Sequence, residues 1–321
     1  MIIIHGRSIK PRFHIKEKMV RASLIEGIRR LDNNAAYALE NNEVKVSLIY
    51  YGDILNRILV DKNPELTKRM TSIGDNWYVP DGRDTKQLEK LLSRPLNSHT
   101  KSDYQALIEK NEIIKFGDDI ARAVSPILNV FGINRRVINR VLPDLGGYIN
   151  SRVISSEIRE RLQPTLKKAL LEKDDIVLIS HSMGCILAYD VLWKFSRMSE
   201  YKELWNKKVG LWLTLGCPLG EPAVKESLYD SNEPNDGMYP KNIVDWVNVS
   251  AQDDFISHDG SLNDDFHQMI DRDLIRSIKD IQQIYTFWVD SKGHCNPHKL
   301  YGYLNHPRVA EILIEWIYKS G

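Results

Sequence analysis

One stretch near the middle of the chain constrains the fold more than any other, because it predicts a strand, a tight turn and a helix in direct succession. Residues 176–179 form the apolar run Ile-Val-Leu-Ile, which is short enough for a strand buried on both faces. A corner of five residues, 180–184, reads Ser-His-Ser-Met-Gly. The apolar residues after it recur at a spacing that suits a buried helix: Cys185, Ile186, Leu187, Ala188, Val191 and Leu192.

The corner carries Ser182 at its apex, which is the layout of a nucleophile elbow. Such an elbow raises a hydroxyl above the carboxyl end of a sheet and directs the next backbone N–H into the same space. The positive end of the helix dipole lies there too, where an oxyanion would form. The usual pattern is G-x-S-x-G, and Ser180 stands in place of the first glycine. That position must be small because helix and strand approach closely, and serine is still small.

The composition indicates a compact protein without a strong overall charge. The chain has 321 residues, 42% of them hydrophobic, and its formal net charge is +1. This balance gives no global field to attract nucleic acid, so we expect no nucleic-acid partner. Three cysteines without a C-x-x-C pair predict a reducing compartment. With no signal peptide at the N-terminus and no apolar run as long as a membrane span, we expect a soluble, cytoplasmic protein.

Strands and helices alternate along both ends of the chain. Apolar or β-rich segments predict six strands, at residues 2–4, 44–51, 176–179, 209–215, 245–249 and 284–289. Helical periodicity predicts helices at residues 18–40, at 151–171 and from Pro307 onward. This alternation predicts an α/β fold with a doubly wound, mostly parallel sheet of about six strands. Ligands in such sheets bind at the carboxyl ends of the strands.

The long interval between the second and third strands predicts an inserted helical cap. We expect a core of residues 1–53 and 172–321 and a cap of residues 54–171, because the interval is far longer than a normal crossover. Within it, residues 120–142 are mostly aliphatic and carry four arginines, Arg122, Arg135, Arg136 and Arg140. This composition suits contact with a lipid surface or an acyl substrate. A helix pair that packs over the core is the alternative interpretation.

Three loops that follow predicted strands offer the side chains of a nucleophilic catalyst. The first offers Ser182, the second Asp253 or Asp254, and the third His294 or His298. A serine hydroxyl is a weak nucleophile that needs a histidine base, and a buried carboxylate orients that histidine. The order nucleophile, acid, histidine is that of α/β-hydrolases.

In these features the sequence resembles serine hydrolases of the α/β-hydrolase superfamily, in their lipase/esterase-like branch. The resemblance covers the core and not the cap, and it implies a version of the fold that lacks the first two strands. The matching segments are Ile2–Gly6, Ser180–Gly184, Thr214–Gly220, Trp246–Val249 with the Asp-Asp loop, and Asn296–Leu304.

The resemblance implies a role for each candidate residue. His298 is the preferred base, since in such relatives the histidine precedes a Gly-Tyr-Leu-like turn into the final helix, and Asp254 is the preferred acid, since an apolar pair follows it. The oxyanion hole combines the backbone N–H of Met183 with that of Arg7. The remaining candidates contact substrate or shape the turn: His5, Gly6 and Tyr51.

The expected activity is therefore hydrolysis of a carboxylic ester of lipid or acyl type, through an acyl-enzyme on Ser182 and without cofactor or metal. Thioesters and amides use the same machinery and remain open. A hydrolase fold without activity, serving in binding or signalling, is a second alternative. A metal site is the third, with ligand-type residues in two groups: His294, Cys295 and His298; and His258, Asp259, Asp264, Asp265 and His267.

Overall fold

A single parallel sheet forms the centre of the molecule. The computed structural model describes residues 1–111, 142–172, 175–228, 232–257 and 260–320. Six strands pair in the order β2-β1-β5-β6-β7-β8, and all five pairings between these strands are parallel. Their bounds are β1 Ile2–Ile4, β2 Ser47–Ile49, β5 Val177–His181, β6 Val209–Leu215, β7 Ile243–Ala251 and β8 Ser277–Ile284. The predicted α/β fold with a mostly parallel six-stranded sheet is confirmed.

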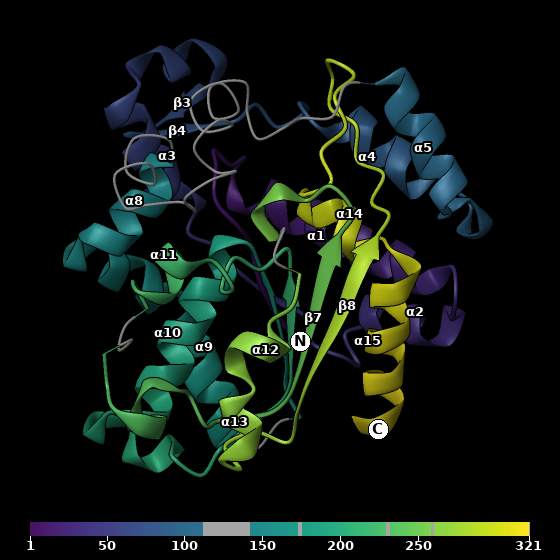
Figure 1. The fold of residues 1–321 in the computed structure, drawn as a ribbon. Helices are drawn as coiled ribbons and strands as arrows, with labels where there is room; N and C mark the ends of the chain where they lie inside the picture. Colours follow the sequence, from purple (N-terminus) through teal and green to yellow (C-terminus); the bar gives the residue numbers. More distant parts are fainter. Residues whose placement is uncertain (112–141, 173–174, 229–231, 258–259, 321) are drawn as a thin grey trace.

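Helices cover both faces of the sheet, and Figure 1 shows the two layers on either side of β7 and β8. One layer lies to the right in that view, and its buried residues share a core with Ile3 and Val177. Its helices are α1 Phe13–Arg29, α2 Asn33–Glu40, α14 Leu300–Leu304 and α15 Pro307–Ser320. Buried residues of α4 Thr85–Leu92 and α5 Lys101–Lys110 join the same core.

The opposite layer packs on the face that carries Ile2, Ile4 and Leu178. Its helices are α3 Gly52–Lys62, α8 Pro143–Asn150, α9 Arg152–Glu172, α10 Met183–Arg197, α11 Pro222–Lys225, α12 Asn263–Phe266 and α13 Gln268–Asp271. Alternate residues of β1 enter opposite cores because successive strand side chains point to opposite faces. A strand covered on both faces therefore needs apolar residues on both sides, as in β1, whose three residues are all isoleucine.

Two tryptophans on neighbouring strands fill the centre of this second core. Trp212 of β6 and Trp246 of β7 are in register and stack with ring centroids 4.3 Å apart. Each indole N–H donates to a buried hydroxyl: Trp212 to Ser180 at 2.9 Å and Trp246 to Thr214 at 3.0 Å. Burial of these large side chains therefore leaves no indole donor of the pair unsatisfied.

Most predicted elements match the structure, with differences at their ends. The strands at residues 2–4, 176–179, 209–215 and 245–249, the helix after the elbow, and the helices at 151–171 and from Pro307 are confirmed in type. The helix predicted at residues 18–40 is wrong as one element, because α1 ends at Arg29 and α2 begins at Asn33. Asp32 caps α2 by accepting a hydrogen bond from the Ala35 N–H at 2.9 Å.

Two strand predictions also need correction. The last strand is not residues 284–289, since β8 ends at Ile284, and the aromatic residues after it, Phe287 and Trp288, are buried in the following loop. β8 is an edge strand with exposed positions. Its sequence is therefore largely polar and lacks the apolar run that predicts a buried strand. Between the second and third predicted strands, the chain also forms a small antiparallel hairpin, β3 Thr71–Ile73 with β4 Asn76–Tyr78. Three-residue strands are too short to show an alternating pattern.

The predicted cap is only partly within the described residues. Arg122, Arg135, Arg136 and Arg140 lie outside them, so the lipid-contact interpretation and its alternative remain predictions. Helix α9, which was assigned to the cap, places Ile158, Leu162, Leu166 and Leu170 in the core on the sheet face. The division into core and cap remains a prediction. Among the described helices, none has the length and apolar character needed to cross a membrane.

Helix α9 allows a matched test of this packing. Leu166 is fully buried, whereas Leu171 on the same helix is 44% exposed. We expect Leu166→Ala to lower the free energy of unfolding by about 2–5 kcal/mol, because it removes buried methyl groups and leaves a cavity. Leu171→Ala is the control and should change it by less than about 1 kcal/mol. Urea denaturation measures both, and equal losses would contradict the placement of α9 in the core.

Candidate active site

Ser182 occupies the sharp turn between β5 and α10. Its backbone has φ 57° and ψ −128°, an unusual conformation for a residue with a side chain. The Ser182 N–H donates to the Leu215 carbonyl at the end of β6, at 3.1 Å. The side chain is almost fully buried. Helix α10 begins at the next residue, Met183, so Ser182 lies at the N-terminus of a buried helix, as the elbow pattern predicts.

Ser180, the residue that departs from the glycine pattern, has a structural role. Its hydroxyl accepts the Trp212 indole N–H at 2.9 Å and donates to the Cys185 sulfur at 3.4 Å. Ser180 is completely buried. A glycine here would leave the indole donor without this acceptor, so the serine at this position is matched to a tryptophan on the neighbouring strand.

His298 and Asp254 form a buried pair in the loops that follow β8 and β7. The imidazole Nδ1 lies 2.9 Å from Oδ1 and 2.8 Å from Oδ2 of the carboxylate. The Tyr303 hydroxyl donates to Oδ2 at 2.5 Å, and the Ile256 N–H donates to Oδ1 at 3.0 Å. The carboxylate therefore holds the imidazole by Nδ1 and directs Nε2 away from itself, as a base requires.

The Asp254 carboxylate remains ionised in this environment. Burial alone would raise its pKa, but the His298 imidazole, the Tyr303 hydroxyl and the Ile256 N–H together bring the pKa below its ordinary value. Hydrogen bonds to a charged acceptor are stronger than those between neutral groups. The acid is thus held as an anion in a place where it can stabilise an imidazolium.

Gly216 lies between the loop that carries Ser182 and the loops that carry Asp254 and His298. It follows Leu215, whose carbonyl binds the Ser182 N–H, and its φ is +54°. A β-carbon at Gly216 would lie 2.9 Å from Asp254 Oδ2 and 3.0 Å from His298 Nδ1. Glycine is required here because both the backbone conformation and the contact exclude a side chain. The Leu215–Gly216 segment therefore contacts both Ser182 and the Asp254–His298 pair, which lie in loops that follow β5, β7 and β8.

The turn after β1 lies directly over the serine. A β-carbon at Gly6 would lie 2.7 Å from Ser182 Cβ, so the backbone of this turn passes against the Ser182 side chain. His5 is fully buried: its Nε2 accepts the Tyr51 N–H at 3.2 Å, and its Nδ1 lies 2.8 Å from the Gly6 carbonyl. Its ring also stacks on Tyr51, with centroids 4.2 Å apart. Their contacts thus shape the turn, and substrate contact by His5, Gly6 and Tyr51 remains a prediction.

Arg7, the predicted second oxyanion donor, is anchored by a residue that the sequence analysis did not single out. Its guanidinium Nε donates to Asp144 Oδ1 at 3.0 Å, and the Ser8 N–H donates to Oδ2 at 2.7 Å. Asp144 lies in the first turn of α8 and is completely buried. The Lys10 ammonium donates to the carbonyls of Arg7 and Ser8. These contacts hold the turn rigid, with its carbonyls directed toward the lysine.

His181, the residue between the two serines of the corner, packs beside His298. Its ring centroid lies 4.7 Å from that of His298, and its Nε2 lies 2.7 Å from the His298 carbonyl. Burial, followed by the nearby His298, lowers the pKa of His181 well below its ordinary value. A neutral His181 then donates from Nε2 to that carbonyl and positions the His298 loop.

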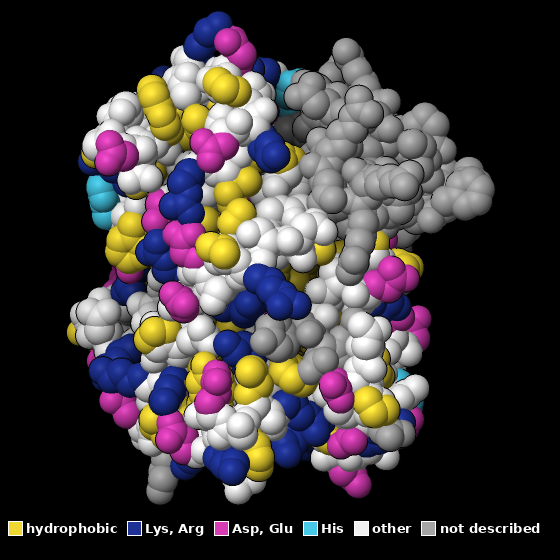
Figure 2. All heavy atoms as spheres, turned by 90° about the vertical axis from the view of Figure 1, so that its left-hand side faces the viewer, with side chains coloured by type: hydrophobic (Ala, Val, Ile, Leu, Met, Phe, Trp, Pro, Cys, Tyr) yellow, Lys and Arg dark blue, Asp and Glu magenta, His cyan; other side chains and the backbone are white. Residues whose placement is uncertain are grey.

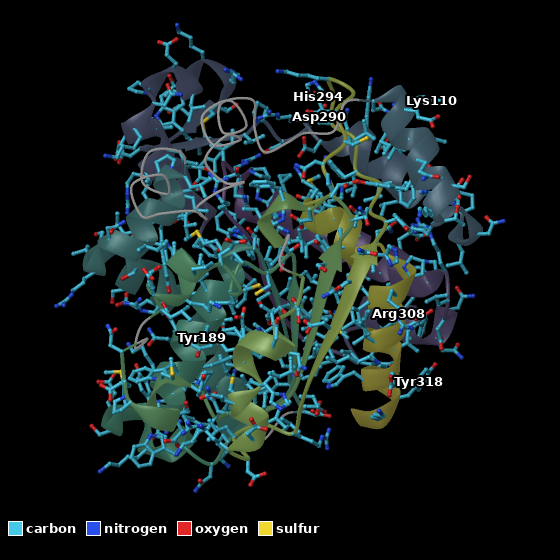
Figure 3. All side chains as sticks on the ribbon, viewed as in Figure 1. Lys110, Tyr189, Asp290, His294, Arg308 and Tyr318 are labelled. Carbon is cyan, nitrogen blue, oxygen red and sulfur yellow. The ribbon has the colours of Figure 1, made fainter. Side chains whose placement is uncertain are left out.

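The two alternative triad candidates lie in different surroundings. His294 and Asp290 lie together in the loop above the sheet, where Figure 3 labels both. The His294 Nδ1 is 3.4 Å from Asp290 Oδ2, and both side chains are partly exposed. Asp253 has φ 60° and accepts a hydrogen bond from the Gln252 side chain at 3.3 Å. The structure therefore pairs the preferred residues, His298 and Asp254, with each other.

The metal alternative finds no cluster in the described part of the chain. Across those residues, no three histidine, cysteine or acidic side chains come close enough to hold an ion. His267 pairs with Asp271 at 3.1 Å, and Cys295 is a buried free thiol. His258 and Asp259 lie outside the described residues.

Tyr303 and Asp144 are the functional candidates that sequence reasoning missed. Tyr303 belongs to the Gly-Tyr-Leu turn, so a signal was present, but nothing local indicates that its hydroxyl reaches Asp254. Asp144 lies in the interval assigned to the cap, distant in sequence from the turn that it anchors.

Comparisons with protein-family models, curated proteins and solved structures found no match to this chain.

The Ser180–Trp212 contact gives a test of the elbow. We expect Ser180→Gly, which restores the usual motif, to lower the free energy of unfolding by about 1–3 kcal/mol, because it leaves a buried indole N–H unsatisfied. Chemical denaturation of Ser180→Gly, Ser180→Ala and wild type measures the loss. Trp212→Phe, which removes the indole donor, combined with Ser180→Gly is the control, and the two losses should be less than additive because both substitutions remove the same hydrogen bond. A glycine variant as stable as wild type would contradict the assigned role.

Proposed function

We propose that this protein is a serine hydrolase of the α/β-hydrolase type, with Ser182 as nucleophile, His298 as base and Asp254 as the orienting acid. The observation that carries the proposal is the buried Asp254–His298 pair, whose carboxylate is held by Tyr303 and the Ile256 N–H. It lies at the strand ends where Ser182 occupies a strained turn. A buried, fully bonded carboxylate on a histidine is typical of a triad.

The reaction follows from the roles of these groups. His298 Nε2 takes the proton as Ser182 Oγ attacks the carbonyl carbon of the ester, and the imidazolium is stabilised by Asp254. The N–H groups of Met183 and Arg7 stabilise the tetrahedral oxyanion. Collapse of this intermediate breaks the ester C–O bond, and the imidazolium gives its proton to the departing alcohol. Water, deprotonated by His298, then attacks the acyl-enzyme and releases the carboxylic acid and free Ser182.

The proposed substrate is a carboxylic ester with an acyl chain. The aliphatic, arginine-bearing composition of residues 120–142 supports an acyl or lipid substrate and contact with a lipid surface. Thioesters and amides pass through the same intermediate, and a comparison of leaving groups would rank them. All three cysteines are buried free thiols, which supports action in the reducing cytoplasm.

An active-site-directed probe tests the nucleophile. We expect a fluorophosphonate to label the wild-type protein on Ser182 and to stop ester hydrolysis in parallel, because the phosphonyl group mimics the tetrahedral intermediate. Ser182→Ala should give no labelling, whereas Ser180→Ala, two residues away, should still be labelled. Intact-mass spectrometry measures the adduct. Absence of labelling on folded wild-type protein would overturn the proposal and favour the inactive, binding-protein alternative.

Matched substitutions test the base and the acid. Asp254→Asn should lower kcat by about 10⁴-fold, because an amide favours the wrong imidazole tautomer. Asp253→Asn changes the adjacent residue and should leave kcat near the wild-type value. His298→Ala should lower kcat at least as much, whereas His294→Ala should not. Steady-state hydrolysis of a 4-nitrophenyl ester measures each variant, and equal effects within either pair would contradict the assignment.

A further inference from the structure

Two lysine ammonium groups are buried beside the proposed active site without a carboxylate partner. Lys10 is 8% exposed and Lys16 is 4% exposed. Lys10 donates to the carbonyls of Arg7 and Ser8, and Lys16 donates to the Tyr301 hydroxyl at 3.0 Å. The Lys16 ammonium also lies 4.1 Å from the centroid of the Tyr301 ring. Within the described ranges, neither lysine forms a salt bridge.

The charged groups around the two lysines do not balance them. Arg7 is engaged by Asp144 at 2.9 Å, and Lys299 is engaged by Asp84 at 3.0 Å. These are the charged groups that act on Lys10, and Lys299 and Asp84 also act on Lys16. Two acids and two of the four cations are thus paired.

Burying a charged group without an opposite charge costs free energy, and this cost applies to both lysines when they are protonated. Burial, followed by the charge of Lys299, lowers the pKa of Lys10 to about 7. Burial, followed by the charge of Lys10, lowers the pKa of Lys16 well below its ordinary value. The charge of Lys10 therefore makes Lys16 harder to protonate. An anion bound between them would supply the missing charge and favour the ammonium form of both.

The position of the lysines links them to the proposed reaction. Lys10 binds the carbonyls of the turn that passes over Ser182, and Lys16 binds Tyr301, three residues after His298. Their charges also reach the histidines that flank the nucleophile: after burial, both lysines lower the pKa of His5 and contribute to the low pKa of His181. At the edge of the cluster, the side chains of Lys299 and Asp84 are each 30% exposed, so this edge faces solvent.

We propose that Lys10 and Lys16 form an anion-binding subsite that holds a carboxylate or phosphate group of the ester substrate while its carbonyl lies at Ser182. The statement that the bound group belongs to an ester substrate rests on the proposed serine-hydrolase function. Anion binding by the two lysines does not depend on that function. Lysine ammonium groups bind both anions as compact point charges. The subsite would favour esters that carry a negative group over neutral esters of the same size.

A pair of esters that differ in one charge tests this preference. We expect the wild type to hydrolyse 4-nitrophenyl hemisuccinate with a higher kcat/KM than 4-nitrophenyl butyrate, which has an acyl chain of the same carbon number. Lys16→Met should lower kcat/KM for the hemisuccinate at least tenfold more than it lowers kcat/KM for the butyrate. Lys18→Met, on an exposed position of α1, is the matched control and should change neither. Equal losses for both esters would overturn the subsite.

A binding measurement separates this proposal from the hydrolase function. On Ser182→Ala protein, inorganic phosphate and succinate are added at constant ionic strength set with sodium chloride, and the midpoint of thermal unfolding is recorded. Stabilisation should grow with anion concentration, because the ligand binds the folded state. The stronger of the two anions identifies a phosphate-bearing or a carboxylate-bearing substrate. Stabilisation without hydrolysis of either ester would retain the subsite and reject the proposed function.

Removing the charge gives a second readout that does not depend on substrate. Without added anion, Lys16→Met should raise the unfolding midpoint, because it replaces a buried unpaired ammonium with an apolar side chain of similar length. Added phosphate or succinate should then stabilise Ser182→Ala protein more than the double variant Ser182→Ala, Lys16→Met. No anion effect on either protein, together with an unchanged midpoint in Lys16→Met, would overturn the proposal.

Discussion

Parallel hydrogen bonding of six strands is the constraint on which the rest of the structure depends. Because all six strands of the main sheet run in one direction, the loops after β1, β5, β7 and β8 emerge at the same edge. Burial on both faces in turn favours apolar strands, and the polar side chains that the central strands β5 and β6 do carry lie near their carboxyl ends. Chemistry is thereby confined to strand ends, where polar side chains can be placed without disturbing either core.

The polar groups at this edge satisfy one another in a connected set. Tyr303 and the Ile256 N–H hold Asp254, and Asp254 holds His298. His181, beneath the pair, contacts the His298 backbone. A buried network of this kind is stable only when its members are bonded, because an unsatisfied polar group in a low-dielectric site is expensive. The same rule explains why Ser180, facing the Trp212 indole, is no mere substitute for glycine.

Charge is distributed very differently on the surface and near the site. On the face in Figure 2, basic and acidic side chains are interspersed, in keeping with a formal net charge of +1. Beside the turn over Ser182, in contrast, Lys10 and Lys16 are buried without an acidic partner in the described structure. Surface charges are screened within about 10 Å, whereas buried ones are screened much less. The proposed anion subsite therefore depends on these two buried lysines and not on the balanced surface.

The sequence by itself determined the parallel α/β sheet, the turn at Ser182 and the order of candidate residues, because these depend on short-range periodicity and on loops that directly follow strands. It also favoured Asp254 and His298 without bringing them together. Only the tertiary structure decided that pairing, the support from Tyr303 and the placement of Lys16 against Tyr301. These contacts join segments far apart in the chain, and β8 shows the same limit, since an edge strand with polar residues carries no local apolar pattern. Which distant groups meet is set by how the strands order and the helices pack, and no local pattern contains that information.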